Sequence, residues 1–177
     1  MSAPLDIRPG TPDDAPGVAR LINAVIAEGA PVLLTGSFSD EQERAFLEGL
    51  APRGGFHLAA APDGHDAPAS VDTLATVAAQ VFAPYAAGMP AHDHVAVMGT
   101  WVAARWRRRG VGRALWERTS AAARERGFTR VFTDLRADNV DSLAYHLALG
   151  FSVAGVARAQ AVIGGRAYDV VFIERGL

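Results

Sequence analysis

Residues 102–115 read Val-Ala-Ala-Arg-Trp-Arg-Arg-Arg-Gly-Val-Gly-Arg-Ala-Leu, which predicts a strand ending near Ala103, a turn, and a helix beginning near Val111. The first four amides of a helix lack partners within the helix, and the helix dipole adds partial positive charge there. Glycine lets an anion approach the backbone closely, and arginine complements a diphosphate. The turn and helix start therefore predict a pyrophosphate site made of Arg107, Arg108, Arg109, Gly110, Val111, Gly112 and Arg113.

Two other nucleotide-binding motifs do not fit this stretch. A P-loop needs Gly-Lys-Ser/Thr, and the chain contains no lysine. The dinucleotide motif Gly-x-Gly-x-x-Gly is not completed, because position 115 is Leu. The remaining alternative is a plain helix start with a solvated basic turn. The strand-turn-helix setting together with the arginines favours the anion site.

Composition narrows the class of protein. A chain of 177 residues is enough for one compact domain, which we predict to span residues 1–177. The net charge of −2 argues against nucleic-acid binding, whereas five of the 17 basic residues lie at positions 105–113, which favours a local anion site. No apolar run approaches the ~18 residues of a membrane span, and the N-terminus lacks signal-peptide features, so we expect a cytoplasmic protein without a membrane partner. The absence of cysteine excludes thiolate metal ligands and a cysteine nucleophile.

Hydrophobic spacing and turn residues predict strands and helices along the whole chain. Thr11 fits the N-cap of a first helix, and Ser39 with Gln42 fits the capping box of a second, whose buried face would carry Phe46, Leu47 and Leu50. Strands are expected at Leu5–Arg8, Phe56–Ala61, Thr73–Phe82, His94–Val102, Arg130–Leu135, Ser152–Val162 and Ala167–Glu174, further helices at Val111–Arg126 and from Asn139 to Gly150, and a turn-rich connection at Pro62–Ser70. This order predicts a single α/β domain with a mixed sheet.

The phosphate turn resembles a motif of the GCN5-related N-acetyltransferases, the GNAT family. Their pattern Arg/Gln-x-x-Gly-x-Gly/Ala is matched by Arg107, Gly110 and Gly112, and their apolar strand residue ten positions before the last glycine is matched by Val102. The resemblance implies a GNAT-like mixed sheet of about six or seven strands flanked by about four helices. It also implies that the turn binds the pyrophosphate of acetyl-CoA, while the strand backbone at Trp101 and Val102 pairs with pantetheine.

The segment from Asn139 to Phe151 resembles the next motif of this family. Asn139 and His146 are seven residues apart and share a helix face. Most family members carry Tyr at the position of His146, where it protonates the departing CoA thiolate, whereas the phosphinothricin acetyltransferase-like branch carries His. The pattern of that branch, Asn-x-x-Ser-x-x-x-His-x-x-x-Gly-Phe, is matched by Asn139, Ser142, His146, Gly150 and Phe151. The resemblance therefore places Asn139, Ser142 and His146 at the cofactor.

His146 and Tyr145 are the candidates for acid catalysis on this helix. An imidazolium has a pKa near 6.5 and a thiol near 8.5, so His146 could act as the general acid. It could equally hydrogen-bond the thioester region, or be a structural histidine bound to a backbone carbonyl. Tyr145 lies about 100° away around the helix, which fits a core position better than a catalytic one.

The base that removes a proton from an amine substrate is not evident. The branch carries Glu five residues before the strand valine, and here that position is Val97. His92, Asp93 and His94 lie just upstream and could act directly or through water. His92 and His94 could also share one strand face as metal ligands, but no third ligand suggests itself, so no metal is expected.

The loop from Gly29 to Phe38 is where the family forms part of its acceptor site. The resemblance makes this loop a candidate wall of the pocket through Leu33, Leu34, Thr35 and Phe38, with Glu28 and Glu41 as weaker candidates for the base.

We therefore expect an N-acetyltransferase that moves the acetyl group of acetyl-CoA to a primary amine of a small molecule, an amino acid or an analogue of one. One alternative is acetylation of a protein N-terminus or lysine. Another is a non-catalytic acyl-CoA sensor, which the missing glutamate favours slightly. The resemblance also implies a homodimer.

Overall fold

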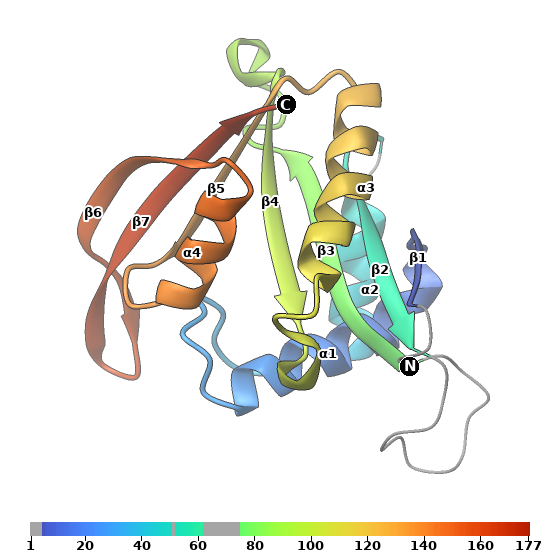
Figure 1. Cartoon of the computed structure of the whole chain (residues 1–177), viewed down its shortest axis with the longest axis horizontal. Coiled ribbons are helices and arrows are strands. Elements are labelled where there is room, and N and C mark those ends of the chain that lie inside the picture. The colour runs from blue at the N-terminus through green and yellow to red at the C-terminus, as the bar shows by residue number, and fades with distance from the viewer. Residues whose placement is uncertain (1–4, 51, 62–74) are drawn as a thin grey trace.

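The computed structural model describes residues 5–50, 52–61 and 75–177, and these form one sheet of seven strands in the order β1-β2-β3-β4-β5-β7-β6 (Figure 1). The strands are β1 (Asp6–Pro9), β2 (Gly55–Ala61), β3 (Ala75–Pro84), β4 (Val95–Val102), β5 (Arg130–Arg136), β6 (Ser152–Ile163) and β7 (Arg166–Gly176). Neighbouring strands are antiparallel except β4 and β5, which are parallel. The predicted connection Pro62–Ser70 and the predicted strand start at Thr73 lie outside the described residues.

Four α-helices in the described part of the chain cover the two faces of the sheet, α1 (Ala15–Ala27) and α2 (Asp40–Gly49) on one, α3 (Val111–Glu125) and α4 (Val140–Ala148) on the other (Figure 1). Side chains alternate between the faces of a strand. Phe56 and Leu58 of β2 accordingly pack against α1 and α2, while Ala59 packs against Leu115 of α3. The predicted α/β class, with a mixed sheet between helices, is confirmed. No helix among these residues is long and apolar enough to cross a membrane.

Two helix details differ from the sequence prediction. Residues Pro12–Asp14 form a short 3-10 turn, so α1 itself begins only at Ala15. On α2, Phe46 was expected to be buried but is 48% exposed. The buried stripe of this helix is instead centred on Glu43 and Leu47, one turn apart, and this turns Phe46 toward solvent.

Glu43 has a buried carboxyl group with an oxygen that forms no hydrogen bond to a described residue. Its side chain is 3% exposed, and its Oε1 has no hydrogen-bond partner among the described residues. Burial raises the pKa of Glu43, because an apolar setting disfavours the ionised form. The folded chain therefore holds this proton more tightly than the unfolded chain, and ionised Glu43 destabilises the fold above its folded pKa.

Glu43→Leu is expected to stabilise the protein by about 1–2 kcal/mol at pH 7, because it replaces a buried carboxyl group that lacks a hydrogen-bond partner by an apolar side chain of similar size. The gain should shrink as the pH falls toward 4, where Glu43 is protonated in the folded state. Thermal unfolding at both pH values measures this. Glu48→Leu, the same change at an exposed position of α2, is the control and should leave Tm nearly unchanged. A lower Tm for Glu43→Leu than for the wild type would contradict the prediction.

Candidate active site

The centre of the sheet is forked. The parallel pairing of β4 with β5 is confined to Val95, Ala96 and Val97, although both strands continue beyond it. At the fork the hydroxyl of Thr133 on β5 donates to the carbonyl of Met98 on β4, with an oxygen–oxygen distance of 2.6 Å. Figure 1 shows the two strands diverging from this point. The last part of β4 therefore has one open edge.

Backbone groups of alternate residues point to the same edge of a strand. The N–H and C=O groups of Thr100 and Val102 consequently face the same open edge as the Met98 carbonyl. A ligand lying in the fork would find these groups unpaired with β5. This is the arrangement required for strand-like pairing with an extended ligand.

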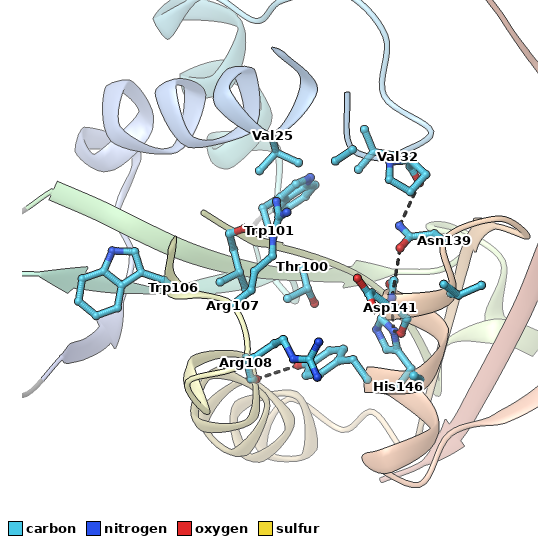
Figure 2. A pocket seen from close by; sticks show the side chains of 18 of the residues that line it. Val25, Val32, Thr100, Trp101, Trp106, Arg107, Arg108, Asn139, Asp141 and His146 are labelled. Atoms are coloured by element: carbon cyan, nitrogen blue, oxygen red, sulfur yellow. Dashed lines mark hydrogen bonds between the residues drawn. The ribbon is translucent and has the colours of Figure 1, made fainter. Parts of the chain in front are cut away.

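A cavity of about 930 Å³ opens beside this edge, within the size range of small-molecule and cofactor sites. Its walls are the end of α1 with the loop after it, the end of β4, the turn before α3, and α4 (Figure 2). The predicted site residues that line it are Trp101, Val102, Arg107, Arg108, Gly110, Gly112, Arg113, Asn139, Ser142, Tyr145 and His146.

The turn before α3 has the backbone that an anion site needs. After a 3-10 turn at Ala104–Trp106, Arg108 and Gly110 take left-handed conformations, with φ of +59° and +81°. Gly110 is the N-cap of α3, a helix of 15 residues, and no side chain of the described residues caps the free amides at its start. The amides of the first turn and the positive end of the helix dipole are therefore available to a ligand.

Arg107 does not point at these amides. Its Nε donates to the carbonyl oxygen of Val102 at 2.9 Å, and its terminal nitrogen forms an ion pair with Glu28 at the end of α1. Figure 2 shows Arg107 extending toward α1, whereas Arg108 extends toward α4. Arg107 thus ties the strand end to the wall formed by α1 and occupies one carbonyl of the open edge.

Two predicted turn residues do not reach the cavity with their side chains. Val111 is 2% exposed and packs with Leu115 in the core under α3, so its side chain does not line the cavity. The guanidinium of Arg109 lies 5.6 Å from the centre of the Trp106 ring and does not line the cavity.

Asn139 fixes the start of α4 and links it to the loop after α1. Its Oδ1 accepts from the amide of Ser142 at 3.1 Å, as an N-cap does, and its Nδ2 donates to the carbonyl of Pro31 at 2.9 Å. This hydrogen bond therefore joins the start of α4 to the loop after α1 across the cavity (Figure 2).

His146 is a buried, neutral imidazole. Its Nδ1 lies 2.8 Å from the carbonyl oxygen of Ser142, and because a carbonyl can only accept, Nδ1 carries the hydrogen. Nε2 then holds the lone pair. Burial lowers the pKa of His146 more than the bond to Ser142 raises it. The ring, 6% exposed and packed edge-on against Phe151, therefore carries no proton to give at neutral pH.

Tyr145 joins α4 to the phosphate turn. Its hydroxyl donates to the carbonyl of Gly112 at 2.8 Å, and a Cβ on Gly112 would lie 2.9 Å from its ring. Burial raises the pKa of Tyr145 to about 12, although a hydrogen bond from Gln80 opposes this shift. The hydroxyl stays protonated at neutral pH, and its hydrogen is held by the carbonyl. Gly112 is thus required by the close approach of this ring.

Asp93 and His94 lie at the other end of β4. The strand begins at Val95, and at ~3.3 Å per residue His94 is about 20 Å from Thr100. Asp93 pairs with Arg53, with a nitrogen–oxygen distance of 3.7 Å, and lines no part of the cavity. The sequence suggested a base here because the residues are close along the chain, but an extended strand separates them from the site.

Other predicted residues are also placed elsewhere. Leu34 and Phe38 pack against the core under α1, and the cavity is lined instead by Gly29, Ala30, Pro31 and Val32 of the same loop. Glu41 is exposed on α2 and lines no part of the cavity. Among the residues described, no group of three His, Asp or Glu side chains could hold a metal ion.

The cavity is also lined by residues that no strong sequence pattern indicates. Glu28, a weak candidate, lines it through its pair with Arg107, and Thr100, Asp138 and Asp141 line it without having been predicted. Thr100 could have been found from strand alternation, because it lies two residues before Val102. The remaining residues line the cavity because distant segments of the chain meet there, and no local sequence pattern predicts that.

The open edge of β4 and the free start of α3 beside one cavity fit an acyltransferase, and comparison with known proteins agrees. Residues 28–151 match the model of the acetyltransferase (GNAT) family. The chain belongs to this family and is an acetyltransferase of the acetyl-CoA-dependent kind. No curated protein sequence matches it significantly.

Solved structures share the fold over nearly the whole chain. The yncA structure from Salmonella typhimurium, with its cofactor acetyl-CoA, has a TM-score of 0.82 at 18% identity, covering 98% of this chain and 94% of that one. A phosphinothricin acetyltransferase from Sinorhizobium meliloti in complex with acetyl-CoA has a TM-score of 0.82 at 17% identity, covering 100% and 89%. A ribosomal-protein-alanine N-acetyltransferase from Brucella melitensis has a TM-score of 0.81 at 22% identity, covering 98% and 100%.

Proposed function

We propose that this protein transfers the acetyl group of acetyl-CoA to the primary amine of a small molecule, an amino acid or an amino-acid analogue. The observation that carries the proposal is the open edge of β4 beside the free amides of α3, both facing one cavity. The diphosphate would lie on the turn from Arg108 to Gly112, and pantetheine would run along Thr100 and Val102 toward the fork.

Acceptor chemistry is supported by the carboxylates of the cavity. An amine with a pKa near that of lysine, about 10.4, arrives as an ammonium ion. Asp141 lines the cavity in the first turn of α4 and forms no ion pair with a described residue, so its charge is available to attract such a cation. The cavity thus offers arginines for the donor on one side and a carboxylate for the acceptor on the other.

His146 is suited to act as a base more than as an acid. Its lowered pKa and its Nδ1 bond leave Nε2 free to accept a proton. The amine nitrogen becomes acidic as it bonds to the thioester carbon, and a neutral imidazole can take the proton at that stage. This role would make up for Val97 at the strand position where the branch carries Glu.

Steady-state release of CoA thiol, measured with a thiol reagent, tests the function. The panel should contain free amino acids, phosphinothricin, a peptide with N-terminal alanine and a peptide with an internal lysine, with a blank that lacks amine. Turnover above the blank with a free amino acid or phosphinothricin, and not with the peptides, is the expected result. Turnover with the alanine peptide alone would overturn the small-molecule acceptor.

A second candidate is acetylation of a protein N-terminus, which the likeness to the Brucella melitensis enzyme favours. The N-terminal amine of a peptide has a pKa near 8 and is easier to deprotonate than an alkylamine. A sensor that binds acetyl-CoA without turnover would give binding in calorimetry and no thiol release with any amine.

We also propose that the protein is a cytoplasmic homodimer. Apolar side chains of α4 and of the edge strand β6 are exposed, namely Val140, Leu147, Val153, Val156 and Val162. A second copy covering them would protect the sheet edge. Sedimentation analysis at several concentrations measures the state directly, and a monomer throughout would contradict the proposal.

A further inference from the structure

A buried amide lies directly behind the fork. Gln80 of β3 is fully buried, and it stands opposite Thr100 of β4 in the antiparallel register. Its Nε2 donates to the Thr100 Oγ1 at 2.8 Å, while its Oε1 has no partner among the described residues. Burying an amide with an unpaired oxygen is unfavourable. The fold nevertheless keeps this amide at the back of the cavity.

The bond from Gln80 determines what Thr100 can do. Because Thr100 Oγ1 accepts from the amide, its own hydrogen is free, and it has no acceptor among the described residues. Thr100 lines the cavity on the part of β4 beyond the fork. Figure 2 shows it between Arg107 on one side and Asp141 and His146 on the other. The hydroxyl is therefore held with a donor toward the reaction space.

Before the amine attacks, neither of the two α4 side chains considered for acid catalysis has a hydrogen free for the sulfur. Tyr145 donates its hydrogen to the carbonyl of Gly112, and His146 donates its Nδ1 hydrogen to the carbonyl of Ser142. The neutral ring of His146 has no second proton. The Thr100 side chain lies on the same face of the sheet as Tyr145, since Gln80 contacts both.

We infer that the Thr100 hydroxyl is a catalytic hydrogen-bond donor to the sulfur of the thioester, and that Gln80 is its positioning residue. The inference rests on the proposed function. The amine nitrogen bonds to the thioester carbon, the carbon–sulfur bond breaks, and sulfur leaves with the electron pair as a thiolate. The proton lost by nitrogen is in the end gained by sulfur, so Thr100 keeps its own hydrogen throughout. Its hydrogen bond strengthens as negative charge develops on sulfur.

The first test measures the thiol of bound CoA and needs no amine. A hydrogen bond to the thiolate stabilises the charged form, so the bound thiol should have a lowered pKa in the wild type. Ultraviolet thiolate absorbance, titrated with saturating CoA and corrected for the protein alone, reports this pKa. Thr100→Val should raise it by about one unit or more, and Thr100→Ser should restore it.

Thr119→Val is the matched control, because the Thr119 hydroxyl is buried against His57 under α3, away from the cavity. This variant should lower stability and leave the bound thiol pKa as in the wild type. Equal thiol pKa values in Thr100→Val and wild type would overturn the inference. Should Thr100→Val be unstable, Gln80→Leu gives the same readout. This variant keeps the Thr100 hydroxyl but removes the hydrogen bond that orients it, and it also removes the unpaired oxygen of Gln80.

The second test is a double-mutant cycle in kcat. Thr100→Val is expected to lower kcat about 10- to 100-fold, with the Kd for acetyl-CoA changed by less than about threefold. Gln80→Leu should lower kcat in the wild-type background. It should lower kcat little further in Thr100→Val, because both changes act on the same hydrogen-bond donor, the Thr100 hydroxyl. Additive effects would contradict the positioning role of Gln80.

The outcomes separate the inference from the proposed function. Wild-type turnover with an unchanged kcat in Thr100→Val overturns the inference alone. A lowered thiol pKa that depends on Thr100, without turnover on any amine, supports the donor and overturns the proposed transferase function. Absence of CoA binding by the wild type overturns both.

Discussion

Gly112→Asp is expected to weaken acetyl-CoA binding by about 100-fold or more relative to Gly112→Asn. Gly112 is the second residue of α3 and lines the cavity at the proposed diphosphate position. A unit charge about 4 Å from a phosphate, at an effective dielectric near 20, costs about 4 kcal/mol. Asparagine has the same shape without the charge, so the comparison isolates electrostatics.

The two variants share a steric effect that must be measured separately. Any Cβ at position 112 lies 2.9 Å from the Tyr145 ring, so both should lose some affinity and stability as that ring shifts. An acidic residue in the first turn of a helix is favourable without ligand, so Gly112→Asp should unfold at a temperature no lower than Gly112→Asn. Calorimetry gives the two Kd values, and equal values would remove the diphosphate from this turn.

The sequence was sufficient to predict the strand, turn and helix within residues 102–115 and the course of the elements around them. The spacing of glycine and arginine can be recognised in the sequence, because Gly110 and the first amides of α3 belong to one short segment. The N-cap Asn139 is likewise local, and α4 begins just after it as predicted. Strand and helix order followed from the same kind of signal, since apolar spacing and turn residues are local to each element.

The interior of the cavity depends on contacts that no local pattern contains. Glu28 and Arg107 are 79 residues apart, and Asn139 reaches Pro31 across 108 residues. Gln80 is a polar residue in a mostly apolar strand, and its contact with Thr100 becomes visible only in the register of β3 and β4. Asp93 and His94 lie outside the cavity for the opposite reason, because residues close in sequence along an extended strand are far apart in space.

His146→Asn is expected to lower kcat by about 100-fold or more while leaving the Kd for acetyl-CoA and Tm close to wild type. The asparagine Nδ2 can keep the donor to the Ser142 carbonyl that the histidine Nδ1 provides, but Nε2 is lost. The variant therefore separates the reacting nitrogen from the structural hydrogen bond. His146→Phe, which removes both nitrogens and keeps a ring against Phe151, should lose turnover equally and also lose stability.

The pH dependence decides between base and acid. The pKa of His146 is lowered from 6.5 by burial, so a base would be fully active at pH 7–9 and would lose activity as the pH falls below 6.5. An acid would show the reverse, with kcat falling as the pH rises through the same lowered pKa. The profile of kcat at saturating amine therefore distinguishes the two, and it should flatten in His146→Asn. If His146→Asn keeps the wild-type kcat, the role of His146 is structural and consists of its hydrogen bond to the Ser142 carbonyl.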